Sequence, residues 1–373
     1  MEPRLDAIAF FGGGTGGHIF PGIAVGERAR ERFPGCRAVF FRTSRSVEET
    51  VFEGRDLETR ILSLGQPGRN PAGWLRYWRE VRRAKQEILS VLRQGFQVAF
   101  GLGGYSSLPG ILAAGKARIP VILLEQNRVA GRVNCLMAPF VAAVSCSYGD
   151  TRLRFPRRQE WTGNPVRREV LDAAVRRRTS GPPSRKHTVL VVGGSQGARG
   201  LNLALRDALP ALGDFLERIH WIHVTGDADK MTMTEAYRIQ GWGADVLAYS
   251  HDLPELMARS DIFLGRAGGT TLAELAVMGL PSVLVPYPYH RDQQQFLNAR
   301  ALEERGGARV IAETDLNAGS LRRVFEEILL VPERLEAMGR SARSFARPDA
   351  ADRILDLAVG LSRRCQPVSE SSF

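Results

Sequence analysis

The sequence has few cysteines, no long apolar run and fewer acidic than basic residues. Its four cysteines form no Cys-x-x-Cys pair and have no histidine at a ligand-like spacing, which argues against a zinc site and a disulfide framework. No apolar run approaches the roughly 20 residues of a membrane-spanning helix. The opening "MEPRLDAIAFF" lacks the basic region of a signal peptide. We therefore expect a cytoplasmic protein.

The charge balance predicts an anionic partner. The chain has 51 Lys and Arg against 40 Asp and Glu, a net charge of +11. Nucleic acid, an acidic membrane surface and phosphorylated small molecules all fit this charge. Nucleic acid ranks last because no RNP, KH or helix-turn-helix signature is present. Positions 152–186 carry eleven basic and three acidic residues. We interpret them as a solvated hinge, with lipid contact left open.

The order of apolar segments predicts an α/β fold. At 373 residues the chain favours two domains. Short apolar strands alternate with helical patterns, which is typical of doubly wound parallel sheets. The halves resemble each other, with "AIAFFGGGTGG" in the first and "TVLVVGGSQGARG" in the second. We predict Rossmann-like domains at 1–163 and 164–345 that face a cleft, then a helix at 346–373 that packs back on the first domain and ends in a frayed tail.

Glycine-rich turns follow apolar strands in both halves. Such a turn opens a helix with unpaired backbone N–H groups and the positive end of the helix dipole, which together bind anions. Neither "GGGTGG" nor "GGSQGARG" has the spacing of a dinucleotide or P-loop motif. One such turn could serve tight packing alone. Two turns, one in each half, favour phosphate binding.

Two further segments in the second half have polar groups after a strand. In "RAGGTTLAELAVMGLP", Thr270 and Thr271 could cap the next helix, and Glu274 could accept from a pair of sugar hydroxyls. "PYPYHRDQQQFLNAR" brings Gln294 and Gln295 to a strand end, where open α/β sheets bind ligands. The alternatives are simple helix starts, with Asp292 as the cap of the second. "DAD" at 227–229 resembles a metal motif without supporting ligands, so we expect a loop, no metal and no cofactor.

One segment has the pattern of a helix that contacts a membrane. In "QPGRNPAGWLRYWREVRRAKQEIL" the aromatic and basic residues of the first turns suit the surface of an anionic membrane. The predicted contact residues are Trp74, Leu75, Arg76, Trp78 and Arg79. The alternative is a helix packed in the core, which we expect for the second half of this segment.

Several motifs occur in the order seen in a known family. "GGGTGGHIFPGIAV", "GLGGYSS", "EQN", "TGNPVR", "GGSQGARGLN", "RAGGTTLAELAVMGLP" and "HRDQQQFLNA" resemble those of the MurG family, bacterial GlcNAc transferases that convert lipid I to lipid II. The resemblance spans about positions 8 to 300. It implies a two-domain GT-B glycosyltransferase on the cytoplasmic face of the membrane, with lipid I on the first domain and UDP-GlcNAc on the second.

The same resemblance implies the reaction and its residues. The reaction would be a metal-independent inverting transfer to the 4-hydroxyl of MurNAc in peptidoglycan synthesis, beside other cell-wall and division proteins. The implied acceptor residues are Thr15, Gly16, Gly17, Gly104, Tyr105, Asn127 and Asn134. The implied donor residues are Arg167, Ser195, Gly269, Thr270, Thr271, Glu274, Gln294 and Gln295. His18 or Glu125 would be the general base, and the sequence leaves that choice open.

The sequence departs from the family at one position and leaves other functions possible. Many relatives have a histidine before Glu-Gln-Asn, whereas this chain has Leu124, so that histidine's role cannot be transferred. A GT-B transferase or sugar-nucleotide epimerase with another substrate is the alternative enzyme. A catalytically silent sugar-nucleotide-binding scaffold is the alternative from another class. His18, Glu125 and Glu274 speak against the scaffold.

Overall fold

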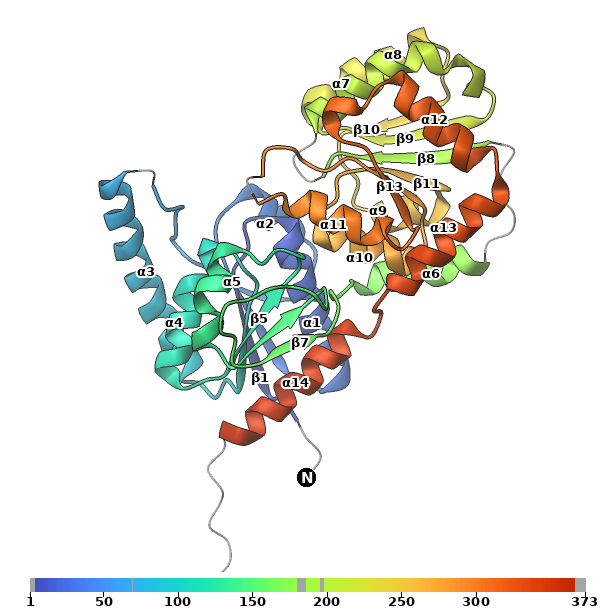
Figure 1. The fold of residues 1–373 in the computed structure, drawn as a ribbon. Coiled ribbons are helices and arrows are strands. Elements are labelled where there is room, and N and C mark those ends of the chain that lie inside the picture. Colours follow the sequence, from blue (N-terminus) through green and yellow to red (C-terminus); the bar gives the residue numbers. More distant parts are fainter. Residues whose placement is uncertain (1–3, 69, 180–185, 195–197, 291, 366–373) are drawn as a thin grey trace, which may run out of the picture. The chain divides into compact units, whose positions relative to one another are not determined.

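The chain folds into two α/β units (Figure 1). The computed structural model describes residues 4–68, 70–179, 186–194, 198–290 and 292–365. The first unit comprises Met1–Arg167 and Asp349–Phe373, and the second comprises Arg168–Pro348. The chain therefore passes between units at 167/168 and 348/349, whereas the sequence pattern predicted 163/164 and 345/346.

A parallel sheet forms the centre of the first unit. Its strands are β1 (Ala7–Phe11), β2 (Arg37–Arg42), β3 (Glu58–Ile61), β4 (Val98–Gly101), β5 (Val121–Glu125), β6 (Ala143–Cys146) and β7 (Gln159–Trp161). Among the described residues their order is β3-β2-β1-β4-β5-β6-β7. Phe10 of β1 pairs with Phe40 and Phe100, whose rings stack on it at 4.4 and 4.9 Å. The strand order reverses between β1 and β4, and ligands bind at such switch points in open α/β sheets.

Helices cover both faces of this sheet. They are α1 (Gly16–Arg32), α2 (Ser46–Phe52), α3 (Pro71–Leu92), the 3-10 turn η1 (Tyr105–Ser107), α4 (Leu108–Ala117), α5 (Arg132–Met137) and α14 (Ala350–Cys365); a further 3-10 turn, η2, spans Ala138–Phe140. One core cluster joins α3 and α4 to the sheet, and another joins α1 and α14 to it. α3 begins cleanly because Pro71 stands at its first position and the Asn70 side chain accepts from the N–H of Gly73 at 2.8 Å.

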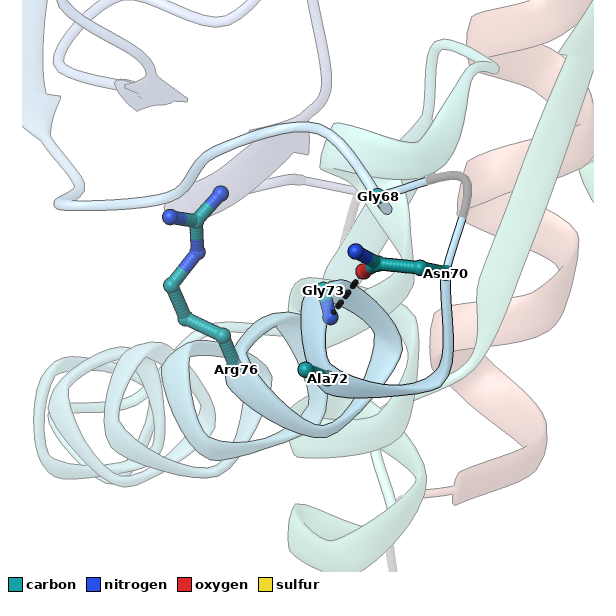
Figure 2. Close-up of a pocket in the computed structure, with 5 residues that line it drawn as sticks. All are labelled: Gly68, Asn70, Ala72, Gly73 and Arg76. Carbon is teal, nitrogen blue, oxygen red and sulfur yellow. Dashed lines mark hydrogen bonds between the residues drawn. The ribbon is translucent and has the colours of Figure 1, made fainter.

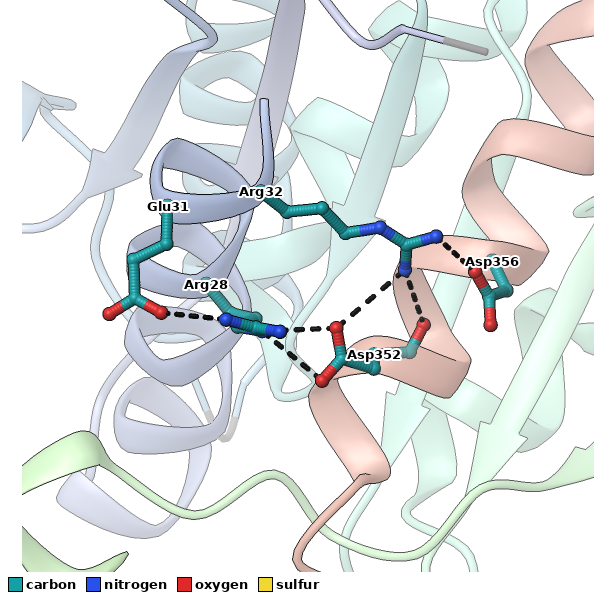
Figure 3. Close-up of polar contacts among 5 residues, drawn as sticks. All are labelled: Arg28, Glu31, Arg32, Asp352 and Asp356. Carbon is teal, nitrogen blue, oxygen red and sulfur yellow. Dashed lines mark hydrogen bonds and ion pairs between the residues drawn. The ribbon is translucent and has the colours of Figure 1, made fainter. Parts of the chain in front are cut away.

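The last helix, α14, returns to the first unit and packs on α1 (Figure 3). Arg28 Nε donates to both carboxylate oxygens of Asp352 at 3.0 and 3.1 Å, and Arg32 donates to Asp356 at 2.6 Å. Leu355 and Ala358 are buried beneath these pairs. Because the ion pairs are partly exposed, most of the stabilisation comes from the apolar contact.

The second unit repeats the architecture. Its strands are β8 (His187–Val192), β9 (Ile219–Val224), β10 (Ala244–Leu247), β11 (Ile262–Gly265), β12 (Ser282–Leu284) and β13 (Ala308–Val310). All of its pairings are parallel, in the order β10-β9-β8-β11-β12-β13. The switch point lies between β8 and β11. The prediction of two doubly wound parallel sheets is confirmed.

The helices of the second unit follow its strands. They are α6 (Arg168–Thr179), α7 (Arg199–Ala208), α8 (Lys230–Ile239), α9 (Leu253–Arg259), α10 (Gly269–Met278), α11 (Gln294–Glu303), α12 (Ala318–Leu329) and α13 (Pro332–Phe345), with the 3-10 turns η3 (Leu209–Phe215), η4 (Asp227–Asp229) and η5 (Glu313–Asp315). None of the helices within the described ranges is both long and apolar enough to cross a membrane.

Part of the basic segment 152–186, which we expected to be a solvated hinge, forms regular structure, while residues 180–185 lie outside the described residues. The described part contains β7 and α6, and Val170 and Ala173 of α6 are buried. Arg177 donates to the carbonyls of Ala258 and Ser260 at the end of α9, and Arg176 pairs with Glu255. Part of the excess charge therefore closes a helix end inside the second unit.

Candidate active site

Two glycine turns meet at the switch point of the first unit. Gly12 and Gly14 follow β1 with φ of +116° and +92°, and Gly103 and Gly104 follow β4 with φ of +99° and +71°. A Cβ added at Gly12 would lie 2.8 Å from the carbonyl oxygen of Gly103. Glycine is thus required by both the backbone conformation and the close approach of the turns.

His18 lies in the first turn of α1, directly after the first glycine turn. Its Nδ1 is 3.2 Å from Thr15 Oγ1. A Cβ at Gly103 would be 3.1 Å from His18 Cδ2 and 3.3 Å from Nε2, so the imidazole packs against the second turn. Burial lowers the pKa of His18 below its usual 6.5. The ring is therefore neutral at pH 7 and has a nitrogen that can accept a proton.

The other predicted acceptor-side glycines and Thr15 build the start of α1. Thr15 is the N-cap in an extended conformation and is exposed, while Gly16 and Gly17 are the first helical residues. A Cβ at Gly16 would lie 3.0 Å from the ring of Phe20. The backbone at this helix start is consequently bare and points its N–H groups away from the helix.

Glu125 is buried at the end of β5 and accepts four hydrogen bonds. One carboxylate oxygen accepts from the backbone N–H and side-chain amide of Asn127 at 2.9 and 3.3 Å. The other accepts from the Gly131 N–H at 2.8 Å and from Asn134 Nδ2 at 2.9 Å. Burial raises the pKa of Glu125, and these four hydrogen bonds act in the opposite direction. The carboxylate is held in place and in turn orients two asparagines.

Asn134 links this carboxylate to the glycine turns. Its Nδ2 donates to Leu124 O at 3.1 Å and would lie 3.8 Å from a Cβ at Gly103. Asn134 Oδ1 and Gln126 Oε1 are buried and accept no hydrogen bond from any residue in the described part of the chain. Buried polar atoms are normally paired, so these two acceptors mark a place for the donors of a ligand or of water.

Tyr105 continues the second glycine turn and is 37% exposed. Its carbonyl oxygen accepts from the Tyr77 hydroxyl of α3 at 2.8 Å. The ring of Tyr105 also meets Trp74 and Tyr77 edge to face, each at 6.3 Å between centroids. Helix α3 is thereby joined directly to a loop of the candidate site.

The first turns of α3 present the apolar and basic surface that the sequence predicted. Trp74, Leu75 and Trp78 are 40%, 56% and 46% exposed, whereas Tyr77 is 1% exposed. Arg76 and Arg79 are also exposed. Figure 2 shows a pocket at the start of this helix, lined by Gly68, Asn70, Ala72, Gly73 and Arg76. The second half of the helix is core, since Ala84, Ile88 and Leu92 are buried.

In the second unit, α10 begins beside the switch point. Gly269, Thr270 and Glu274 are buried and Thr271 is half-buried. The expectation that the threonines cap this helix is wrong. Gly268 is the N-cap, and both threonines lie inside the first turn. The helix begins at Gly269, one residue before Thr270. The cap position therefore falls on Gly268, which has no side chain to cover the start of the helix.

Gln295 ties two strand ends together. Its Oε1 accepts from the Tyr287 N–H after β12 at 2.9 Å and from the Ala267 N–H after β11 at 3.3 Å. Gln294 is the first residue of α11, and its N–H is 3.4 Å from Asp292 Oδ1. The N-cap is Gln293 rather than Asp292. Gln294 and Gln295 therefore lie at the carboxyl edge of this sheet, as the sequence predicted.

The remaining donor residues have different positions. Ser195 lies outside the described residues, which resume at Ala198. Arg167 belongs to the first unit instead of the second domain in which we placed it. It is buried, and its guanidinium stacks 3.9 Å from the ring centroid of Phe20 on α1. The charge of Arg167 is thus held near the start of α1.

Asp229 of the "DAD" segment has a structural partner. Residues Asp227–Asp229 form η4, which opens α8, and Asp229 accepts from Asn202 Nδ2 at 2.8 Å. The Oδ1 of Asn202 accepts from Nε2 of His223 at 3.0 Å, and the other ring nitrogen contacts the Tyr237 hydroxyl at 3.1 Å. This buried network anchors α7 to the end of β9. Within the described ranges no group of three His, Cys, Asp or Glu side chains could hold a metal.

Comparison with known proteins identifies the family. The glycosyltransferase family 28 N-terminal domain matches residues 8–146, and the family 28 C-terminal domain matches residues 188–354. The UDP-N-acetylglucosamine–N-acetylmuramyl-(pentapeptide) pyrophosphoryl-undecaprenol N-acetylglucosamine transferase of Anaeromyxobacter dehalogenans (strain 2CP-1) is 39% identical over 356 residues, which cover 95% of this chain and 92% of that protein. The protein of the same name from Thermodesulfovibrio yellowstonii is 34% identical, with coverages of 96% and 99%.

Solved structures agree with this assignment. The crystal structure of Acinetobacter baumannii MurG has a TM-score of 0.73 and 25% sequence identity, and the match covers 95% of this chain and 99% of that one. A protein from Listeria monocytogenes named as a putative UDP-N-acetylglucosamine 2-epimerase shares the fold, with a TM-score of 0.68 at 14% identity over 97% of this chain and 98% of that one. The chain belongs to glycosyltransferase family 28 and, within it, to the MurG family.

Proposed function

We propose that this protein transfers GlcNAc from UDP-GlcNAc to the 4-hydroxyl of MurNAc in lipid I, forming the β-1,4 linkage of lipid II in peptidoglycan synthesis. Likeness to GlcNAc transferases over 95% of the chain supports this activity. The observation that carries it is the cluster at the first switch point. There His18 and Asn134 flank Gly103, and Glu125 holds Asn134.

His18 is the proposed general base. In the proposed tautomer Nδ1, which lies 3.2 Å from Thr15 Oγ1, carries the proton and donates to that hydroxyl, so that Nε2 accepts the proton of the MurNAc hydroxyl. The hydroxyl oxygen then attacks C1 of GlcNAc, and the bond from C1 to the UDP phosphate oxygen breaks. Because the attack comes from the side opposite the leaving UDP, a single displacement converts the α-linked donor into a β-linked product.

Glu125 is the proposed positioning residue rather than the base. Both of its oxygens already accept two hydrogen bonds, so a substrate hydroxyl would have to displace one of those donors. In this role the carboxylate orients Asn127 and Asn134 toward the acceptor sugar. The unpaired Asn134 Oδ1 then accepts from an N–H or O–H of that sugar.

The second unit is the proposed donor domain. The open start of α10, with Gly269, Thr270 and Thr271, receives the nucleotide, and Glu274 accepts from the ribose hydroxyls. Gln294 and Gln295 bind and recognise the GlcNAc group, and Ser195 contacts the diphosphate. The departing UDP is stabilised by helix N-termini and by Arg167, with no metal ion at the catalytic centre.

The exposed start of α3 is the proposed membrane contact. Trp74, Leu75 and Trp78 enter the interface while Arg76 and Arg79 meet anionic headgroups. The hydrogen bond from Tyr77 to Tyr105 supports this proposal, because it joins the exposed start of α3 to the proposed acceptor loop, which suits a substrate carried on a lipid. We infer a peripheral protein of the cytoplasmic membrane face that works beside other cell-wall synthesis and division proteins.

The test is transfer of radiolabelled GlcNAc from UDP-GlcNAc to a short-chain lipid I analogue in the presence of EDTA. His18→Ala should abolish most product while UDP-GlcNAc affinity is kept, because the histidine is on the acceptor side. Glu125→Gln tests the rival base. If Glu125→Gln transfers GlcNAc with a bell-shaped pH dependence whose acid limb lies at the same pH as in the native protein, Glu125 is a positioning residue. If the acid limb is lost, Glu125 is the base. No product from the native chain would refute the proposed function.

A further inference from the structure

The carboxylate of Glu48 lies directly beneath the first glycine turn. Glu48 is on α2 and its side chain is 0% exposed. One oxygen accepts from the Gly14 N–H and from Thr43 Oγ1, both at 2.7 Å, and the other accepts from the Thr43 N–H at 2.6 Å. All three partners are donors, and short bonds of this kind to a carboxylate are among the strong ones in proteins.

The turn and the carboxylate fit each other sterically. A Cβ added at Gly13 would lie 2.8 Å from Glu48 Oε1 and 2.9 Å from its Cδ, so any larger residue would press on the carboxylate. Gly14 has a φ of +92°, and a Cβ there would lie 2.8 Å from Arg45 Nη1. Because Gly13 and Gly14 have no side chain, Glu48 and Arg45 can both pack closely against the turn.

This contact changes how the glycine turn can bind an anion. The N–H of Gly14 would be a natural donor to a phosphate oxygen, but it already donates to a buried carboxylate. The Gly13–Gly14 end of the turn is consequently filled by the protein's own anion. The diphosphate of a lipid-linked acceptor is left with the other end, where Thr15 and Gly17 are exposed and His18 follows.

We propose that Glu48 is a positioning residue for the acceptor site, which rests on the proposed function. It occupies the anion position at Gly14 and locks the turn in the conformation that sets Thr15 against His18. Glu48 touches no substrate. It influences the Thr15–His18 contact through the Gly14 backbone. It therefore affects binding of the lipid acceptor and leaves binding of UDP-GlcNAc unchanged.

Glu48→Gln tests this directly in the full-length protein. The amide has the same shape, but its NH₂ must face either the Gly14 N–H or the Thr43 N–H, which brings two donors together. We expect the KM for a short-chain lipid I analogue to rise about tenfold, the equivalent of about 1.4 kcal/mol. The Kd for UDP-GlcNAc, measured by calorimetry without acceptor, should stay within about twofold.

Two further variants separate positioning from general stability. Thr43→Val is the matched control, because it removes one donor to Glu48 and leaves the Gly14 contact intact. It should leave the acceptor KM nearly unchanged. Gly13→Ala presses on the carboxylate from the side of the turn while Glu48 stays in place, so it should raise the acceptor KM as Glu48→Gln does. Gly13→Ala also provides the test if Glu48→Gln fails to fold.

Amide hydrogen exchange distinguishes this proposal from the proposed function. The peptide that contains Gly14 should exchange faster in Glu48→Gln and Gly13→Ala than in the native protein or Thr43→Val, whatever the acceptor is. The proposal is overturned if exchange is unchanged, or if the acceptor KM and the UDP-GlcNAc Kd move together. If exchange changes as expected but the native protein does not use lipid I, the proposed function is refuted, whereas the role of Glu48 in holding the glycine turn is supported.

Discussion

Removing the Tyr77 hydroxyl should loosen the loop that contains Tyr105, the proposed acceptor loop, without disturbing the exposed start of α3, the proposed membrane contact. Tyr77 lies on α3 with its ring buried, and its hydroxyl donates to Tyr105 O at 2.8 Å. Burial raises the pKa of Tyr77 to about 12, so the hydroxyl remains a donor at any pH in which the protein is assayed. Tyr77→Phe keeps the ring and its packing against Trp74 and Tyr105.

The loss of stability in Tyr77→Phe depends on which hydrogen bonds Tyr105 O keeps. A neutral hydrogen bond contributes about 0.5–1.5 kcal/mol net, and leaving a buried partner unpaired adds to this. Tyr105 O also accepts from the Leu108 N–H, so it does not become unpaired. We therefore expect Tyr77→Phe to lower the free energy of unfolding by about 1 kcal/mol. For a unit of this size that is a fall in Tm of about 2–4 °C.

The assay compares Tyr77→Phe with Tyr237→Phe. Tyr237 is also buried and its hydroxyl contacts His223 Nδ1 at 3.1 Å, but it lies in the second unit. Both variants should lose stability in urea, and Tyr237→Phe should lose more, because it leaves the buried His223 Nδ1 without its hydroxyl partner. Only Tyr77→Phe should raise the KM for the lipid I analogue, by up to about fivefold for 1 kcal/mol, while binding to anionic vesicles is unchanged. Equal acceptor KM values in the two variants would refute the idea that this bond holds the loop.

Three further predictions concern single residues. Because burial lowers the pKa of His18, the acid limb of kcat/KM for the acceptor should have its midpoint below pH 6.5; a midpoint above 6.5 contradicts the assignment. Burial lowers the pKa of His223 to about 3, so between pH 6.5 and 3 the unfolded chain binds a proton that the folded chain does not. Stability should therefore fall with acid by up to about 1.4 kcal/mol per pH unit, and His223→Gln should flatten that slope in urea titrations. Gly103→Ala places a Cβ at φ +99° and 3.1 Å from the His18 ring, so transfer should fall at least about tenfold with UDP-GlcNAc binding kept; unchanged transfer would place His18 away from the reaction.

Local signals in the sequence were enough for the sheets and the glycine turns. Strands such as β1 and β8 are buried on both faces and therefore appear as continuous apolar runs. The turns after them need positive φ, which leaves runs of glycine that are visible without a structure. The start of α3 was also predictable, because helical spacing brings Trp74 and Trp78 to one face. Residue roles at both sites came from family resemblance rather than from these patterns.

Some local details and all contacts between distant segments could not be predicted from such patterns. The start of α10 was misplaced, because a hydroxyl residue one position inside a helix looks the same in sequence as an N-cap residue. Arg167 was assigned to the second domain because we placed the domain boundary at 163/164, inside the basic, proline-containing segment. In the structure, however, its guanidinium stacks on Phe20 of α1.

The sequence by itself determined the two doubly wound units and the kinds of groups at their strand ends, because buried strands and bare turns follow from each residue's own neighbours. Only the tertiary structure decided which groups these turns contact. Glu48 stands 34 residues from Gly14 and Tyr77 stands 28 residues from Tyr105. No periodicity in the chain links such pairs. They meet because parallel strands end at a common edge, and the helices between those strands bring distant side chains to that edge.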